Sequence, residues 1–101
     1  MSGTPVLSSG QRVLRVFKAL KGYSIDGISN GELAKSLGES PANVTRALQC
    51  LIKEGLAAKL DNGRFSHSVA ALQICFAHTR ALDASQQRIH ELQQRVAAGS
   101  H

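Results

Sequence analysis

Two helical patterns follow one another between residues 28 and 54 with almost no chain between them. The first pattern ends at Gly38, where glycine can adopt the left-handed conformation that follows the last turn of many helices. The second opens with Ser40 as a capping residue and Pro41 at the first helical position, where the missing N–H of proline leaves no hydrogen bond unmade. Because the connection is so short, the two helices must cross at a steep angle.

The first helix of this pair is expected to cover ISNGELAKSLG, with either Ser29 or Asn30 as its capping residue. The helix dipole favours a negative charge in the first turn, where the sequence has Glu32. The apolar residues of this helix are spaced so that they share one face. They are Leu33, Ala34 and Leu37.

The second helix, from Pro41 to Glu54, has two unlike faces. The face expected to pack in the core comprises Val44, Leu48, Leu51 and Ile52. The opposite face presents Ala42, Asn43, Arg46, Gln49 and Lys53. Arginine, asparagine and glutamine are the side chains that form paired hydrogen bonds with the edges of guanine and adenine. This exposed face therefore has the chemistry needed to read a DNA sequence.

A β-hairpin is expected directly after the second helix. The Asp61-Asn62-Gly63 segment is a strong hairpin-turn signal, and short strand candidates flank it at residues 58–60 and 64–66. The hairpin would form a wing beside the two helices.

A further helix is expected ahead of the pair, from about Gly10 to Lys21. Ser8 and Gln11 have the spacing of a capping box at its start. Its apolar stripe comprises Val13, Leu14, Phe17 and Leu20. Three helices followed by a hairpin predict a mainly α fold with a small β-hairpin wing, a winged helix-turn-helix.

We expect this domain to occupy residues 9–68, after a flexible leader at residues 1–8. One or two C-terminal helices are expected at residues 69–98. Residues 99–101 would be a tail of the kind that an expression tag leaves.

The segment from Val69 to Ala98 has apolar residues at near-heptad spacing. The residues Cys75, Leu82, Ile89 and Val96 are each seven apart. One long helix would bury such a stripe against a second copy of the chain. The side chains expected to form this dimer contact are Leu82, Ile89, Leu92 and Val96. The stripe is interrupted at Ser85 and Gln86, and Asp83 or Ser85 could cap a new helix, so two shorter helices are the alternative.

The charge of the chain suits a polyanionic partner. The net charge is +5 and the sequence pI is close to 9.8. Nine basic and five acidic residues precede Val69, against three and two from there onward, so the excess lies with the predicted winged domain. No apolar stretch approaches the roughly 20 residues that span a bilayer, and no signal peptide precedes the first helix. We therefore expect a cytoplasmic protein with no membrane partner.

Catalytic and metal sites are not indicated. Cys50 and Cys75 form no CxxC motif and no metal-like pair with a histidine, so we interpret both as reduced packing residues. The histidines are widely scattered, at His67, His78, His90 and His101. There is no glycine-rich phosphate loop and no paired-carboxylate motif. We therefore expect a protein that is not an enzyme and that uses no cofactor and no metal.

The stretch from about Gln11 to Ile74 resembles the N-terminal DNA-binding domain of the IclR family of bacterial regulators. The segments that carry the resemblance are RVLRVFKAL, ISNGELAKSLGESPANVTRALQCLIKEGLA and NGRFSHSVAALQI. The pattern that opens the family's recognition helix, a small polar residue, Val, Thr or His, then Arg, is matched by Asn43, Val44, Thr45 and Arg46. The usual aromatic-leucine-glycine sequence after the wing is replaced here by Ser66-His67-Ser68.

The resemblance implies a winged fold and DNA binding. Members of the family also carry a large C-terminal effector-binding domain, for which this chain has no room. We therefore expect no small-molecule effector domain.

The residues nearest the start of the second helix should reach deepest into the major groove. The predicted base-reading residues are Asn43, Arg46 and Gln49. The predicted contacts to the DNA backbone come from Ser29, Asn30, Lys35, Ser40, Thr45 and Lys53. The wing offers Lys59, Asn62, Gly63 and Arg64, of which the arginine is suited to a narrow minor groove or to the backbone.

These features predict a small transcription regulator that binds double-stranded DNA sequence-specifically as a homodimer, of the stripped-down type that phages and mobile elements use. The alternative is an interaction module, in which the winged fold or its helical tail binds another protein. The basic charge favours the first prediction, whereas the missing effector domain and the long tail keep the second one open.

Overall fold

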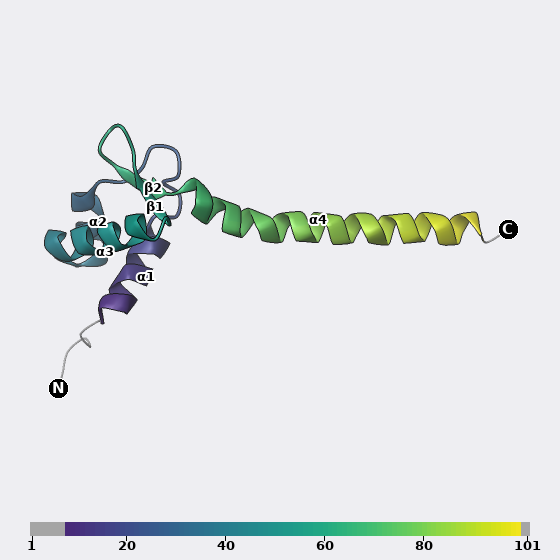
Figure 1. Ribbon diagram of the computed structural model, residues 1–101, viewed down its shortest axis with the longest axis horizontal. Helices are drawn as coiled ribbons and strands as arrows, with labels where there is room; N and C mark the ends of the chain where they lie inside the picture. The colour runs from purple at the N-terminus through teal and green to yellow at the C-terminus, as the bar shows by residue number, and fades with distance from the viewer. Residues whose placement is uncertain (1–7, 100–101) are drawn as a thin grey trace. The chain divides into compact units, whose positions relative to one another are not determined.

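The computed structural model describes residues 8–99. Its elements are α1 (Ser9–Ala19), α2 (Asn30–Leu37), α3 (Pro41–Lys53), β1 (Ala57–Lys59), β2 (Phe65–His67) and α4 (Val69–Ala98), as Figure 1 shows. This order confirms the predicted winged helix-turn-helix with a C-terminal helix. The chain divides into two compact units, one ending at Ala71 and the other beginning at Leu72. The predicted leader and tail lie outside the described residues, apart from Ser8 and Gly99.

Serine hydroxyls cap the first three helices. Each accepts a hydrogen bond of 3.1 Å from the backbone N–H three residues further on. The capping serines are Ser8, Ser29 and Ser40. The cap of α2 is therefore Ser29 and not Asn30, because the Ser29 hydroxyl accepts from the amide of Glu32 while the carboxylate of Glu32 accepts from the amide of Ser29.

The turn between α2 and α3 has the conformation that the sequence predicts. Gly38 has φ 67° and ψ 31°, the left-handed region, and its N–H bonds back to the last turn of α2. A side chain at this position would be strained, so glycine is what allows only two residues to separate the end of α2 from the cap of α3.

The core lies where α1 and α2 pack on the inner face of α3. Its most completely buried apolar side chains, each no more than 1% exposed, are Val16, Leu20, Leu33, Val44 and Leu48. The prediction that Leu14 and Ile52 pack in the core is wrong, since Leu14 is 63% exposed and Ile52 is 39% exposed.

The two errors have the same physical reason. The buried stripe of α1 follows the spacing i, i+3, i+4, i+7 through residues 13, 16, 17 and 20, so Leu14 lies about 100° away from it. The core face of α3 follows the same spacing through residues 44, 47, 48 and 51. Ile52 is the next residue along, at the edge of that face.

The hairpin pairs β1 with β2 antiparallel, with Ala57 opposite His67 and Lys59 opposite Phe65. Both strands lie one residue further from the turn than predicted, because residues 60 and 64 close the turn through a 2.7 Å bond between the Leu60 N–H and the Arg64 carbonyl. Ile28 extends the sheet by exchanging two 2.8 Å backbone hydrogen bonds with Phe65. The hairpin is thereby fixed to the segment that leads into α2.

The start of α4 is anchored within the first unit. The Ser68 hydroxyl accepts a 3.0 Å bond from the Ala71 N–H and donates a 2.6 Å bond to the carbonyl of Gly55. Ala71 is 3% exposed. These contacts fix the first turn of the helix against the domain.

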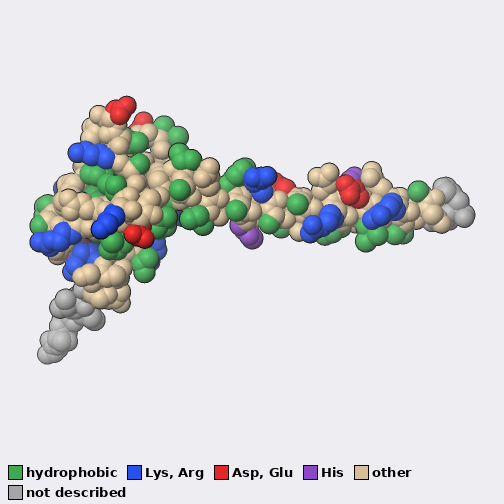
Figure 2. All heavy atoms as spheres, in the orientation of Figure 1, with side chains coloured by type: hydrophobic (Ala, Val, Ile, Leu, Met, Phe, Trp, Pro, Cys, Tyr) green, Lys and Arg blue, Asp and Glu red, His purple; other side chains and the backbone are tan. Residues whose placement is uncertain are grey.

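The second unit is the remainder of α4. Residues 69–98 form one uninterrupted helix, so neither Asp83 nor Ser85 caps a second one. From Leu72 to Gly99 every residue except Ser85 is exposed. Hydrophobic side chains (green) lie along its surface in Figure 2, interspersed with basic ones (blue). Among the described residues, no helix has the length and hydropathy needed to cross a membrane.

Candidate nucleic-acid interface

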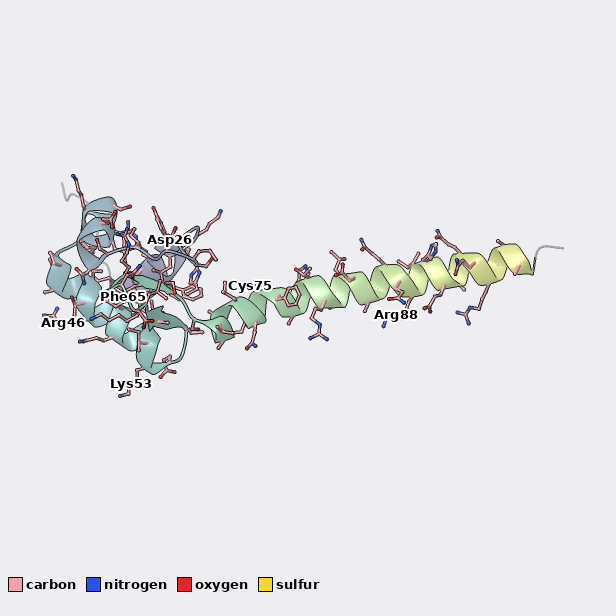
Figure 3. All side chains as sticks on the ribbon, turned by 90° about the horizontal axis from the view of Figure 1, so that it is seen from above. Asp26, Arg46, Lys53, Phe65, Cys75 and Arg88 are labelled. Atoms are coloured by element: carbon pink, nitrogen blue, oxygen red, sulfur yellow. The ribbon has the colours of Figure 1, made fainter. Side chains whose placement is uncertain are left out.

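The outer face of α3 carries Asn43, Arg46, Gln49 and Lys53, and we refer to these four residues as the recognition face. Arg46, Gln49 and Lys53 are exposed. Arg46 and Lys53 project away from the domain in Figure 3. Because their spacing is i, i+3 and i+7, the three side chains line one side of the helix and can meet one partner together.

Asn43 differs from the other three because it is only partly exposed and its amide is bound at both ends. The Asn43 Nδ2 donates to the Glu39 Oε1 at 3.4 Å, and the Asn43 Oδ1 accepts from the Arg46 Nη1 at 2.9 Å. One of the three predicted base-reading side chains is thus bound within the protein.

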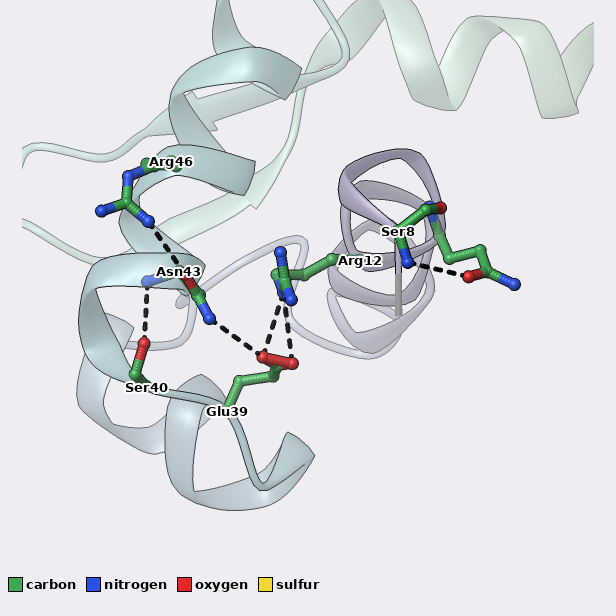
Figure 4. A network of polar contacts seen from close by, with 7 residues as sticks. Ser8, Arg12, Glu39, Ser40, Asn43 and Arg46 are labelled. Carbon is green, nitrogen blue, oxygen red and sulfur yellow. Dashed lines mark hydrogen bonds and ion pairs between the residues drawn. The ribbon is translucent and has the colours of Figure 1, made fainter. Parts of the chain in front are cut away.

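Glu39 joins this contact to α1. The Arg12 Nε donates to both carboxylate oxygens of Glu39, at 3.0 and 3.2 Å, as Figure 4 shows. The two side chains are 20% and 14% exposed. No role was predicted from the sequence for Arg12 or for Glu39. The i, i+4 spacing of Glu39 and Asn43 was a usable signal, whereas Arg12 lies 27 residues away in the chain and gave none.

The residues predicted to contact the DNA backbone differ in whether their side chains already form hydrogen bonds within the protein. The hydroxyls of Ser29 and Ser40 are used as helix caps. The Asn30 Nδ2 donates to the Thr45 Oγ1 at 2.7 Å, and that hydroxyl donates to the Pro41 carbonyl at 2.9 Å. These hydrogen bonds hold the first turns of α2 and α3 together.

Lys35 and Lys53 are exposed and form no ion pair within the part of the chain that the structure describes. They are the lysines of this set that have a charge free for a phosphate.

The side chain of Arg64 turns back onto the domain. Its Nε donates to the Gly27 carbonyl at 3.1 Å, and its Nη2 forms an ion pair with the Glu32 Oε1 at 2.8 Å. The approach is so close that a Cβ at Gly27, which has φ 77°, would lie 2.8 Å from the Arg64 Cβ. The arginine therefore fixes the wing to the start of α2.

Asn62 fixes the wing in a similar way. Its Nδ2 donates to the Asp26 carbonyl at 3.1 Å, and its Oδ1 accepts from the Arg64 N–H at 2.9 Å. Gly63 has φ 83° in the turn. Lys59 is exposed, with its Nζ 5.9 Å from the centre of the Phe65 ring.

We expect Arg64→Ala to weaken binding to specific and to random DNA by similar factors, because contacts with Gly27 and Glu32 bind its side chain to the domain and an arginine that only orients the wing carries no base information. Loss of its exposed ion pair with Glu32 should change the free energy of unfolding only slightly, because solvent screens such pairs. Fluorescence titrations with both DNAs, together with thermal unfolding, measure the two effects. A loss of affinity confined to one base position would contradict this prediction.

The pKa of the Glu32 carboxyl is lowered, first by its hydrogen bonds with the side chain and backbone of Ser29 and then by the charge of Arg64. A lowered pKa means that the charged form stabilises the fold at neutral pH, and that this stabilisation is lost as the pH falls through the folded-state pKa. We expect the parent to be more stable than Glu32→Gln at neutral pH and to lose this advantage on acidification. Thermal unfolding of both proteins over a pH series tests this, and a difference that does not change with pH would contradict it.

Two hollows flank the recognition face. One, of about 220 Å³, is lined by Asn30, Thr45, Leu48, Gln49, Ile52, Lys59 and Phe65. It brings several of the predicted contact residues of α2, α3 and the wing to one place. The other, of about 260 Å³, lies between α1 and α3 and is lined by Ser9, Arg12, Val13, Asn43, Arg46, Ala47 and Cys50.

The cysteines are exposed, so the interpretation of Cys50 and Cys75 as packing residues is wrong. Cys50 lies outside the core face of α3, and Cys75 lies on the part of α4 beyond the last buried residue. Within residues 8–99, no three His, Cys, Asp or Glu side chains are grouped so that they could hold a metal ion.

The helix-turn-helix geometry described above agrees with a family match. The model of the IclR helix-turn-helix domain matches residues 9–61. This chain belongs to the IclR helix-turn-helix family. The family is one of DNA-binding transcription regulators and not of enzymes, and the matched region contains all of α1, α2 and α3 together with β1.

Solved structures give further comparisons for this IclR domain. It is similar to the crystal structure of Pseudomonas aeruginosa HmgR, with 27% identity and a TM-score of 0.64 over 76% of this chain and 33% of that chain. The chain thus spans about a third of HmgR. A mutant of Lactococcus lactis ZitR matches with 20% identity and a TM-score of 0.46, over 94% of this chain and 65% of that one. No curated protein matches the chain.

Proposed function

We propose that this IclR domain binds double-stranded DNA at a specific sequence, as a homodimer, and thereby regulates transcription. The observation that carries the proposal is the recognition face, because it is built on the second helix of the tight turn and Arg46, Gln49 and Lys53 are exposed on it. Arg46 and Lys53 project away from the domain in Figure 3. A helix presented in this way fits the major groove. The net charge of +5 favours association with a polyanion.

In this proposal Arg46 and Gln49 contact base edges. Arginine binds guanine through two parallel hydrogen bonds, and glutamine binds adenine in the same way. Lys35, Lys53 and Lys59 are exposed, and they would contact phosphates on either side of the groove. The wing, fixed through Arg64 and Asn62, places Lys59 beside α3.

We assign the dimer contact to the apolar side chains of α4. The exposed fractions are 50% for Leu82, 57% for Ile89, 55% for Leu92 and 65% for Val96. Complete burial of such a side chain contributes roughly 1.5–3 kcal/mol. A dimer in which the α4 helices of two copies bury these side chains against each other would therefore gain several such contributions. A dimer has two recognition helices, which would read an inverted repeat with half-sites about 34 Å apart or a multiple of that distance.

The exposed stripe of α4 also favours a second candidate function, in which the helix binds a different protein. A salt titration on a random duplex separates the two functions. If the chain binds DNA, the logarithm of its affinity should fall linearly with the logarithm of salt concentration, with a slope of about 0.9 per phosphate contacted. Affinity that is absent, or that does not respond to salt, would contradict the DNA-binding proposal and favour the interaction module.

A further inference from the structure

An acidic residue lies beside the recognition face of a protein that we propose binds a polyanion. Glu39 is in the turn between α2 and α3, and its side chain is only 14% exposed. The guanidinium of Arg12 donates to both of its carboxylate oxygens and so offsets its charge. The Oε1 of Glu39 also accepts a hydrogen bond from the Asn43 Nδ2 at 3.4 Å.

Asn43 connects this carboxylate to Arg46. An asparagine that reads adenine uses its Oδ1 and Nδ2 together. Here the Nδ2 donates to Glu39 and the Oδ1 accepts from the Arg46 Nη1. Each end of the amide keeps one further hydrogen-bonding site, but the contacts with Glu39 and Arg46 fix the orientation in which that site could be used.

Arg46 keeps hydrogen-bond donors that its contact with Asn43 does not use. A guanidinium carries five N–H donors, and within residues 8–99 the Nη1 of Arg46 is the nitrogen that has a partner. Its other nitrogens are free to form the paired contact with the O6 and N7 of guanine.

We propose that Glu39 and Asn43 are positioning residues that set the base specificity of Arg46. The series Arg12, Glu39, Asn43, Arg46 holds the guanidinium in one orientation before DNA arrives (Figure 4). Arginine has many rotamers, so a side chain that is already fixed loses less freedom on binding and reaches fewer wrong base edges. This inference rests on the proposed DNA binding, and it assigns Asn43 a positioning role in place of the predicted base contact.

The test compares two variants that remove the same charge. Glu39→Gln keeps an Oε1 that accepts from Asn43, whereas Glu39→Leu keeps the approximate size of the side chain but has no acceptor. Both variants lose one negative charge, so any general gain in affinity for DNA is the same in each. Thermal unfolding of the free proteins establishes that both remain folded.

Sites are first selected from a random DNA pool with the parent and with Arg46→Ala. The base position at which Arg46→Ala loses preference is the position that Arg46 reads. The readout is the base preference of each variant at that position. We expect Glu39→Leu and Asn43→Ala to lower discrimination at that same position by about threefold to tenfold, whereas Glu39→Gln keeps it. The double variant Asn43→Ala/Arg46→Ala should lose no more base discrimination at that position than Arg46→Ala alone. Gln49→Ala should change a different position.

Two results would overturn the inference and leave the proposed function standing. They are unchanged discrimination in Glu39→Leu, and a loss in Asn43→Ala at a base position of its own. If the parent has no sequence preference at all, the proposed function fails and this inference fails with it. Side-chain ¹⁵N relaxation of Arg46 in the free protein tests the same link without DNA. Arg46 should be more mobile in Glu39→Leu than in Glu39→Gln, and equal mobility would contradict the inference.

Discussion

Replacing Leu82 and Ile89 together with aspartate is expected to convert the protein to monomers and to abolish most binding to its selected site. Both side chains are at least half exposed on a single helix, so the change leaves the core of the winged domain untouched. Two carboxylates from each copy would then lie in the shared apolar contact, where unpaired charges are strongly disfavoured. Sedimentation equilibrium at tens of micromolar measures the oligomeric state.

The matched control is the pair Gln87→Asp and Gln94→Asp. These residues have the same seven-residue spacing and lie on the opposite side of α4 from the apolar stripe. The control adds the same negative charge to the same helix, so it reproduces any general repulsion from DNA. We expect it to remain dimeric and to keep its affinity for the site. An unmutated protein that sediments as a monomer, both with and without DNA, would contradict the dimer proposal.

Arg46→Ala is expected to weaken binding to the selected site by about 1–3 kcal/mol while leaving the fold intact. The arginine is exposed on the recognition face, and among the residues that the structure describes its side chain hydrogen-bonds to Asn43. Its removal should erase preference at one base position, beyond the uniform loss that the missing charge causes. Calorimetric titration of the site and of a single-base variant measures both parts.

A charge-matched control for this prediction is Arg80→Ala. Arg80 is exposed on α4 and lies outside the recognition face, so its removal takes away one positive charge and no base contact. We expect Arg80→Ala to bind the selected site nearly as well as the parent. If Arg46→Ala also binds as tightly as the parent, α3 is not the recognition helix.

The features that could be predicted from the sequence are those set by neighbouring residues. Caps at Ser8 and Ser40, the left-handed Gly38 and the hairpin turn at residues 61–63 depend on residues a few positions apart. The outer face of α3 was predictable because an amphipathic helix has only one way to bury its apolar side. The predictions that Leu14 and Ile52 belong to the core were wrong because each lies one residue from the buried stripe. At the edge of a stripe, an apolar side chain alone does not show which residues of the helix face the core.

The contacts that tertiary packing creates could not be predicted. Arg64 lies 32 residues after Glu32, and nothing in the local sequence indicates that it turns back from the wing to the start of α2. The pairing of Ile28 with Phe65 and that of Arg12 with Glu39 are equally remote in sequence. The contacts that bind Asn43 to Glu39 and Arg46, and Arg64 to Gly27 and Glu32, were likewise not predicted from the sequence.

The central claim is that the recognition face of α3 reads a DNA sequence, and selection of bound sites from a random duplex pool tests it most directly. We expect enrichment of an inverted repeat whose half-sites are separated by about 34 Å or a multiple of that distance. The selected site should bind the parent more tightly than random duplex at the same salt concentration. A pool that shows no enrichment after repeated rounds, from a protein that remains folded, would contradict it.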